Sequence, residues 1–326
     1  MNDPLIYARA IHFAATLSVT GAAFFLVFIA EPASRGVDKG ARLPMTVRVQ
    51  VGWTAWIGLL VTLISGAAWL VIVAHSMSGA SLAEVFSQDV LGTVLLQTGF
   101  GQDWIARSVL AVVLAGLFVP FLSSRGGKAI SINAIVVALA AGLTGSLVWA
   151  GHAVGAAGIE GIVHPAADFL HLVAAAAWVG TLLPLALLLS RAGHDAASVA
   201  IARMATVRFS SFGIGSVATL LVTGSINAWY LAGSIPALTE TDYGHLLMTK
   251  VALFLGMVAI AAVNRLRLTP RLVQDASAPV AADGLWQLRR NTAVEVAVGA
   301  VIIAIVAALG TDPPGFEAVM HTHHPH

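Results

Sequence analysis

The chain alternates long apolar runs with short polar segments. Runs of membrane length cover residues 5–30, 51–75, 104–123, 130–150, 164–190, 208–232, 244–265 and 291–309. A helix needs about 20 mainly apolar residues to cross the hydrocarbon of a bilayer. The runs lack the period-2 alternation of barrel strands, and lipid admits only helices or closed barrels. The pattern therefore predicts an all-α polytopic membrane protein with eight transmembrane helices.

One segment between these runs is too polar to span. Residues 81–103 hold apolar side chains that can form one face of a helix, namely Leu82, Val85, Phe86, Val90, Val94 and Leu95. Two interpretations fit: an amphipathic helix lying on the outer surface, or an ordinary packed loop helix.

The composition agrees with a membrane protein. Hydrophobic residues make up 58% of the 326 residues and charged residues 10%, whereas a soluble domain is about 25% charged. The net charge of +1 gives no reason to expect a nucleic-acid partner. The absence of cysteine excludes thiolate metal sites, disulfides and cysteine nucleophiles. The first run is too long for a cleavable signal peptide, and no basic region precedes it.

The positive charges alternate along the connections between runs. The odd-numbered connections hold nearly all of the lysine and arginine: Arg35, Lys39, Arg42, Arg48, Arg125, Lys128, Arg191, Arg203, Arg208, Arg265, Arg267, Arg271, Arg289 and Arg290. Cytoplasmic loops carry this excess. We therefore expect the odd connections in the cytoplasm and both termini in the periplasm.

The histidines gather on the opposite side. On this topology only His194 of the 11 histidines is cytoplasmic. Imidazole binds copper, zinc, nickel and haem iron. We interpret the outer side as a metal-facing or haem-facing surface.

The segment from Trp149 to Pro184 concentrates this chemistry. His164, Asp168 and His171 are spaced i, i+4 and i+7, which places them on one face of a helix. The candidate metal ligands are His12, His152, His164, Asp168, His171 and the tail residues His321, His323, His324 and His326. Alternatives stay open, because His164 can cap the helix start, while His171 and His12 can bond to neighbouring helices. Methionines close to several histidines, without any thiolate, favour copper over zinc.

The two halves of the chain resemble each other. His12 precedes Gly21 by nine residues, and His171 precedes Gly180 by nine. Further matches keep the same order: Thr46-Val47-Arg48 with Thr206-Val207-Arg208, Ser65-Gly66 with Thr223-Gly224, and residues 98–101 with 241–244. They predict two parallel four-helix repeats, residues 1–150 and 151–310, followed by a periplasmic His-rich tail, residues 311–326. We hypothesise that His12 and His171 face each other across a pseudo-twofold axis and share a ligand.

These residues also carry a family resemblance. GHAVGAAGIEGIVHPAADFLHLVAAAAWVGTLLPL, RFSSFGIGSVATLLVTGSINAWYLAGS and ARAIHFAATLSVTGAAFF resemble segments of the bacterial CopD/PcoD copper-resistance membrane proteins. The resemblance implies an inner-membrane protein of eight helices that moves copper from periplasm to cytoplasm, often with a CopC-like periplasmic partner. It also implies that His12, His152, His164 and His171 match the family's motif histidines.

The sequence therefore leads us to expect a copper-binding membrane protein, not an enzyme, that takes up periplasmic copper, as Cu(I) or Cu(II), for homeostasis or resistance. The chain has no Walker-type phosphate loop and no P-type ATPase motif, so ATP hydrolysis within it would not power transport. The main alternative is a haem-binding, cytochrome b-type electron-transfer protein. A third possibility is an assembly subunit whose histidines only capture metal.

Overall fold

The computed structural model describes residues 3–37, 43–87, 89–123, 127–151, 158–192, 196–270 and 278–313. Within these ranges every regular element is a helix. Eight helices are long and apolar enough to cross a membrane: Pro4–Val37, Met45–Ser78, Gly99–Ser123, Ile130–Ala150, Glu160–Arg191, Ala197–Ala232, Asp242–Leu268 and Asp283–Leu309. This confirms the predicted all-α membrane fold.

Several spans consist of more than one helical segment. The first joins α1 (Pro4–Phe24), the π-helical segment η1 (Phe25–Ala30) and α2 (Glu31–Val37). The fifth joins α8 (Glu160–Ala175), the π-helical segment η3 (Ala176–Gly180) and α9 (Thr181–Arg191). The remaining elements are α3 (Met45–Ser78), α4 (Leu82–Ser87), α5 (Val90–Gln97), α6 (Gly99–Ser123), α7 (Gly127–Gly145), η2 (Ser146–Ala150), α10 (Ala196–Ala232), α11 (Ile235–Thr239), α12 (Asp242–Val263), η4 (Asn264–Leu268) and α14 (Ala278–Leu309).

The helices extend beyond the apolar runs that predicted them. α10 begins at Ala196, although its apolar run begins at residue 208, and α3 begins at Met45 instead of residue 51. An apolar run marks only the part of a helix that lies in the hydrocarbon of the membrane. The helix itself can continue into the polar interface, because its backbone hydrogen bonds do not require apolar side chains. Arg203 and Arg208 consequently lie within a helix, not in a loop.

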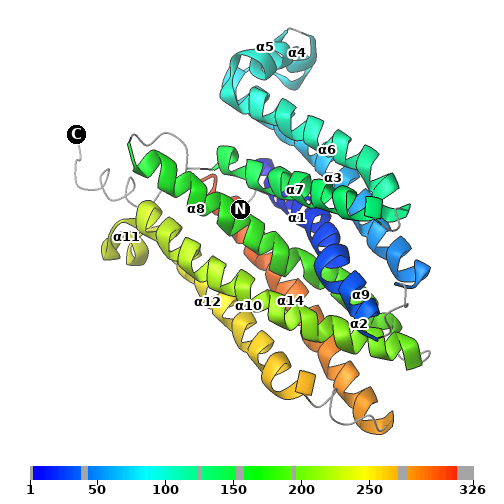
Figure 1. The fold of residues 1–326 in the computed structure, drawn as a ribbon. Coiled ribbons are helices and arrows are strands. Elements are labelled where there is room, and N and C mark those ends of the chain that lie inside the picture. The colour runs from blue at the N-terminus through cyan, green and yellow to red at the C-terminus, as the bar shows by residue number, and fades with distance from the viewer. Residues whose placement is uncertain are drawn as a thin grey trace.

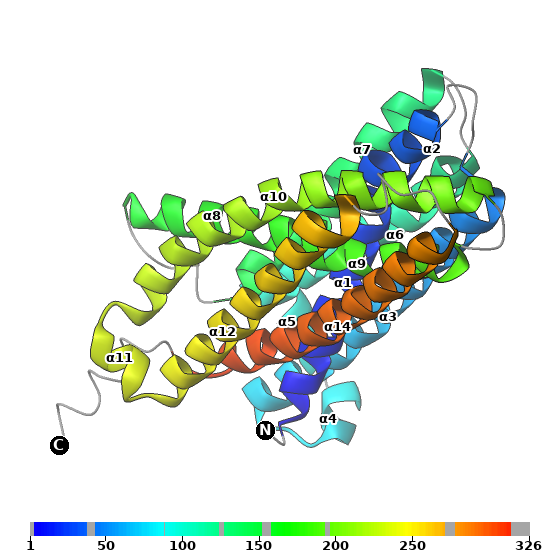
Figure 2. The ribbon, with the colours of Figure 1, turned by 90° about the horizontal axis from the view of Figure 1, so that it is seen from below.

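The first span lies at the centre of the bundle. It is 78% buried over its most apolar stretch, whereas Asp242–Leu268 is 11% buried. α1 packs against α3, α7, α14, η3 and α9, and Figure 1 shows it between the blue-to-cyan first half and the yellow-to-red second half. The view from below in Figure 2 shows the same central position.

Two glycines allow the two halves to approach closely. Gly21 of α1 lies against the backbone of Gly180 in η3, and a Cβ atom on either would overlap the other helix. Thr20 beside this crossing donates to the Ala140 carbonyl at 2.7 Å. The crossing fixes the position of α1 relative to α8 and α9.

The polar segment after α3 forms two short helices. α4 and α5 replace the single helix expected over residues 81–103, and α6 already starts at Gly99. Val85 and Val94 pack with Leu70 and Ala74 of α3, while Phe86 stays 67% exposed. One face is therefore packed and the other is free to meet the membrane interface.

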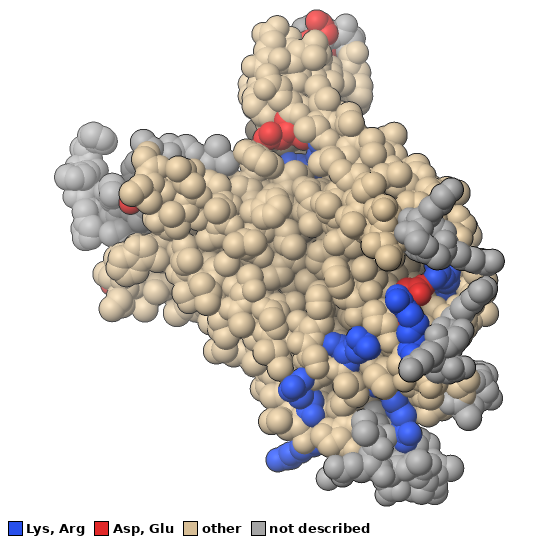
Figure 3. Space-filling model, in the orientation of Figure 1, with Lys and Arg blue, Asp and Glu red and all other residues tan. Residues whose placement is uncertain are grey.

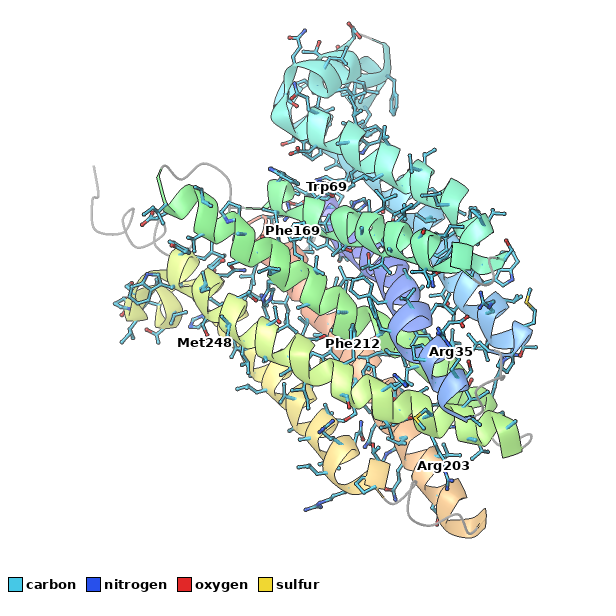
Figure 4. All side chains as sticks on the ribbon, in the orientation of Figure 1. Arg35, Trp69, Phe169, Arg203, Phe212 and Met248 are labelled. Atoms are coloured by element: carbon cyan, nitrogen blue, oxygen red, sulfur yellow. The ribbon has the colours of Figure 1, made fainter. Side chains whose placement is uncertain are left out.

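The charges are distributed unequally over the two ends of the bundle. In the face shown in Figure 3, most of the visible lysine and arginine lies at the lower right, and a smaller patch lies just below the lobe of α4 and α5. In Figure 4, Arg35 and Arg203 lie toward that end, whereas Trp69 and Met248 lie toward the other. This asymmetry agrees with the predicted cytoplasmic arginines.

Candidate functional site

His12 occupies a buried position on α1. The helix starts at Pro4, with Asp3 accepting a bond from the Leu5 amide as its N-cap. The His12 side chain is 2% exposed. Its Nδ1 lies 3.1 Å from the Thr62 carbonyl oxygen and 3.2 Å from Ser65 Oγ, both on α3.

These two contacts define the tautomer of the ring. The Thr62 carbonyl can only accept, and the Ser65 hydroxyl donates to the Val61 carbonyl at 2.6 Å. Nδ1 must therefore carry the proton, which leaves the lone pair on Nε2. His12 Nε2 is buried and has no hydrogen-bond partner among the described residues.

Aromatic and cationic groups surround His12. Trp69 meets the ring edge-on, with centroids 5.5 Å apart. The guanidinium carbons of Arg9 and Arg107 lie 5.1 Å and 5.7 Å from the Trp69 ring centroid. Arg107 also donates to the hydroxyl and carbonyl oxygens of Ser146, both at 3.3 Å.

Two residues of this pocket lie deeper than their positions in the sequence suggest. Trp69 lies near the end of the apolar run 51–75 and Arg107 near the start of the run 104–123, yet they are 2% and 3% exposed. A Trp or Arg near the end of an apolar run can be interfacial or buried, and the residue type does not distinguish the two. α4 and α5 cover the neighbouring part of α3, at Leu70 and Ala74.

His171 on α8 repeats the arrangement in the second half. Its Nδ1 lies 3.0 Å from Thr223 Oγ1 of α10, and that hydroxyl donates to the Thr219 carbonyl at 2.6 Å. Nδ1 again carries the proton, and Nε2 has the lone pair. A Cβ on Gly224 would lie 3.2 Å from His171 Cε1, just as one on Gly66 would lie 3.3 Å from His12 Cε1.

The predicted face of α8 packs against α10. Asp168 Oδ1 accepts a hydrogen bond from Asn227 Nδ2 at 3.0 Å, and His164 stacks on Tyr230 with centroids 5.0 Å apart. With His171 on Thr223, all three residues contact one helix, as the i, i+4, i+7 spacing predicts. Lys250 of α12 lies within electrostatic range of Asp168.

Further contacts match between the halves. Thr98 Oγ1 and Thr241 Oγ1 each accept from the amide three residues later, Gly101 or Gly244, at 3.0 Å. The two-repeat organisation itself stays a prediction. The charges differ, because Arg9 occupies the position 159 residues before Asp168, the same offset that joins His12 to His171.

The structure does not gather the predicted ligands into one metal cluster. Among the described residues, no group of three His, Asp or Glu side chains is arranged to hold a metal ion. His12 is bonded to α3, whereas His171 is bonded to α10. Each Nδ1 is therefore bonded within its own half, and a ligand shared between the two rings stays a prediction.

The other candidates divide into two groups. His152 and the tail histidines His321, His323, His324 and His326 lie outside the described residues. His75 and His245 are exposed and contact the carbonyl oxygens of Ala80 and Thr239, at 2.6 Å and 3.0 Å. Glu160 is exposed at the start of α8.

Comparison with known proteins gives the family. Residues 203–309 match the model described as copper resistance protein D, and residues 1–162 match its N-terminal domain. The chain is 31% identical over 326 residues to copper resistance protein D of Pseudomonas syringae pv. tomato, covering 98% of this chain and 100% of the relative. The chain belongs to the copper resistance protein D family.

Two further relatives agree with this family. The inner membrane protein YebZ of Escherichia coli K12 is 33% identical over 95% of this chain and 98% of its own length. The copper transport protein CutJ of Bacillus subtilis 168 is 28% identical over 81% of this chain, which spans 46% of that relative. Together with the eight spans, these matches make the chain a multi-pass inner-membrane protein of a copper-resistance family.

Proposed function

We propose that this protein takes up periplasmic copper at histidine nitrogens and moves it across the inner membrane to the cytoplasm. The two sites are the His12 pocket (His12, Ser65, Gly66 and Trp69) and the His171 pocket (His171, Thr223 and Gly224). Copper is the cargo here, not a resident cofactor, and the protein is not an enzyme.

The observation that carries this proposal is the common tautomer of the two rings. In both, Nδ1 donates to an oxygen of the neighbouring helix, and Nε2 keeps its lone pair. A histidine that ligates metal is commonly oriented in this way by a bond on its other nitrogen. Nε2 of His12 is buried and has no hydrogen-bond partner among the described residues. A histidine that only bridges two helices does not require such a nitrogen.

Each pocket offers one imidazole nitrogen, so copper needs further donors. Imidazole and thioether ligands suit copper in a chain without thiolates. We assign the capture of copper to His152 and to the tail histidines, which the sequence places on the same side of the membrane. Asp168 lies one turn before His171 and can balance the charge of an arriving ion.

The distribution of charge supports the proposed direction of transport. Arginine gathers at one end of the bundle, and the positive-inside rule makes that end cytoplasmic. Both termini and both histidine pockets then lie toward the periplasm. A CopC-like periplasmic protein is the partner that would deliver copper there.

The test is the copper content of purified protein after loading and desalting. All variants carry alanine at His152 and at the four tail histidines, so that the capture histidines do not mask the pockets. We expect His12→Ala and His171→Ala each to lower bound copper and the double variant to abolish it. His75→Ala and His245→Ala are the matched controls, because these exposed histidines contact backbone carbonyls and should leave the copper content unchanged.

A visible spectrum of the same samples separates copper from haem. The Nε2 lone pair of either ring also suits haem iron. A Soret band that disappears in His12→Ala or His171→Ala would replace the copper proposal with the cytochrome b-type alternative. Equal copper content in all variants would remove both pockets from the mechanism.

A further inference from the structure

A partly open cavity of about 300 Å³ lies within the second half. It is lined by residues of η3, α9, α10, α12, η4 and α14, and its lining is largely apolar, with Leu185, Phe209 and Val258 among the lining residues. The exposed Arg265 also lines it, so the cavity reaches the arginine-rich end of the bundle.

Glu295 of α14 lines this cavity and is 1% exposed. Its Oε2 accepts a hydrogen bond from Asn264 Nδ2 at 3.4 Å. Asn264 Oδ1 in turn accepts from Asn291 Nδ2 at 2.6 Å. Glu295 Oε1 is buried and has no hydrogen-bond partner among the described residues.

The position of Glu295 makes an ionised carboxylate unfavourable. The residue lies five positions after Arg290, within the span Asp283–Leu309. At about 1.5 Å per residue it is about 8 Å deeper than that arginine. Burying a charge at membrane depth is costly unless it is paired and hydrogen-bonded, so an acidic residue there usually has a function.

Three arginines of η4 and α14 interact with groups other than Glu295. Arg265 of η4 donates to Ser210 Oγ of α10 at 2.9 Å, and Arg289 of α14 donates to the Leu189 carbonyl of α9 at 2.6 Å. Arg290 lies over the Trp286 ring at 5.2 Å. The cavity-lining residues that α9, η3, α10 and α12 contribute are neither acidic nor basic.

The hydrogen bonds favour a proton over a metal ion as the ligand. Both side-chain polar atoms of Asn264 are already bonded, which leaves Glu295 Oε1 as the one unpaired carboxylate oxygen of the cluster. Hard metal ions need about six oxygen ligands, whereas one oxygen binds one proton. The lining also contains the hydroxyl groups of Thr206, Ser210 and Thr292, which water bound in the cavity would need as hydrogen-bond partners.

We propose that Glu295 is a proton-binding site that exchanges its proton with the cytoplasmic side through this cavity. The assignment is independent of copper. It gives the second half a protonatable group within the membrane in addition to the histidines.

The experiment uses dicyclohexylcarbodiimide, which converts protonated carboxyls in apolar surroundings to a stable N-acylurea. The full chain in proteoliposomes is treated over a range of pH, and the label is located by peptide mass spectrometry. We expect label on Glu295, decreasing as the pH rises, and none at position 295 in Glu295→Gln. Glu240→Gln, which removes an exposed carboxyl, is the control and should label as the unmodified chain does.

A second variant keeps the carboxyl and changes its environment. Asn264→Ala removes the donor to Oε2 that favours the ionised form, so labelling should persist to higher pH. No label on Glu295 at any pH, labelling independent of pH, or an unchanged profile in Asn264→Ala would overturn the proposal. Protection by sodium chloride but not by choline chloride would also overturn it, by assigning the site to sodium.

Discussion

Gly21 and Gly180 lie against each other where α1 crosses η3, so closely that neither position has room for a Cβ atom. The crossing lies nine residues after His12 on one helix and nine after His171 on the other. At about 1.5 Å per residue, each histidine is about 14 Å along its helix from the contact. The two pockets are therefore held at matching distances from one shared point.

This relationship predicts opposite effects of the same substitution at different glycines. Gly21→Ala or Gly180→Ala forces two backbones apart and should destabilise the protein by at least about 1–3 kcal/mol, the usual range for overpacking. Gly116→Ala and Gly142→Ala meet nothing within 4 Å, and each should gain up to about 1 kcal/mol of helix propensity. Thermal unfolding in detergent measures both. Equal effects at all four positions would contradict the close crossing.

The tautomer argument predicts unequal effects at the two pockets. His171 Nδ1 bonds to the Thr223 hydroxyl, so Thr223→Val should weaken copper binding at His171 by about 10–100-fold. His12 Nδ1 retains the Thr62 carbonyl when Ser65 is replaced, so Ser65→Ala should have a smaller effect.

Competitive copper titration measures these affinities. Thr249→Val is the matched control, because its exposed hydroxyl bonds only within α12, to the His245 carbonyl at 2.8 Å. A loss of affinity in Thr249→Val as large as in Thr223→Val would indicate a general effect of removing hydroxyls, not control of the imidazole.

The absence of cysteine makes the topology easy to test. Ser81→Cys and Ser234→Cys should react with a membrane-impermeant maleimide from the periplasm, because these exposed positions lie at the histidine end. Ser123→Cys and Ser190→Cys, exposed at the arginine end, should react only after permeabilisation. The reverse labelling pattern would show that the protein has the opposite orientation in the bilayer, which would contradict the proposed direction of copper uptake.

The sequence predicted the membrane spans and the face of α8 that holds the candidate ligands. It did not predict which residues of other helices contact that face. The spacing of His164, Asp168 and His171 places them on one side of α8 whatever lies opposite. Their partners on α10, among them Thr223 and Asn227, depend on how the helices pack. The spacing of residues within one helix does not show which other helix packs against it.

The first pocket was harder to predict than the second. Its key neighbours, Trp69 and Arg107, resemble interfacial residues by type and by distance from a helix end. Trp69 packs against Phe13 and Phe100, and Arg107 bonds to Ser146, so their burial depends on packing between helices that the sequence does not report. The internal repeat was the sequence feature that could have indicated this pocket. Ser65-Gly66 matches Thr223-Gly224, and the match suggests that both pairs contact a histidine.

The most direct test of the account is copper K-edge X-ray absorption of the loaded protein with alanine at His152 and at the four tail histidines. If copper binds at the two rings, the spectrum contains imidazole scattering that decreases in His12→Ala and in His171→Ala and is absent from the double variant. An imidazole signal of the same size in the double variant, or a spectrum without nitrogen ligands in the unmodified pockets, would contradict the assignment of copper to these histidines.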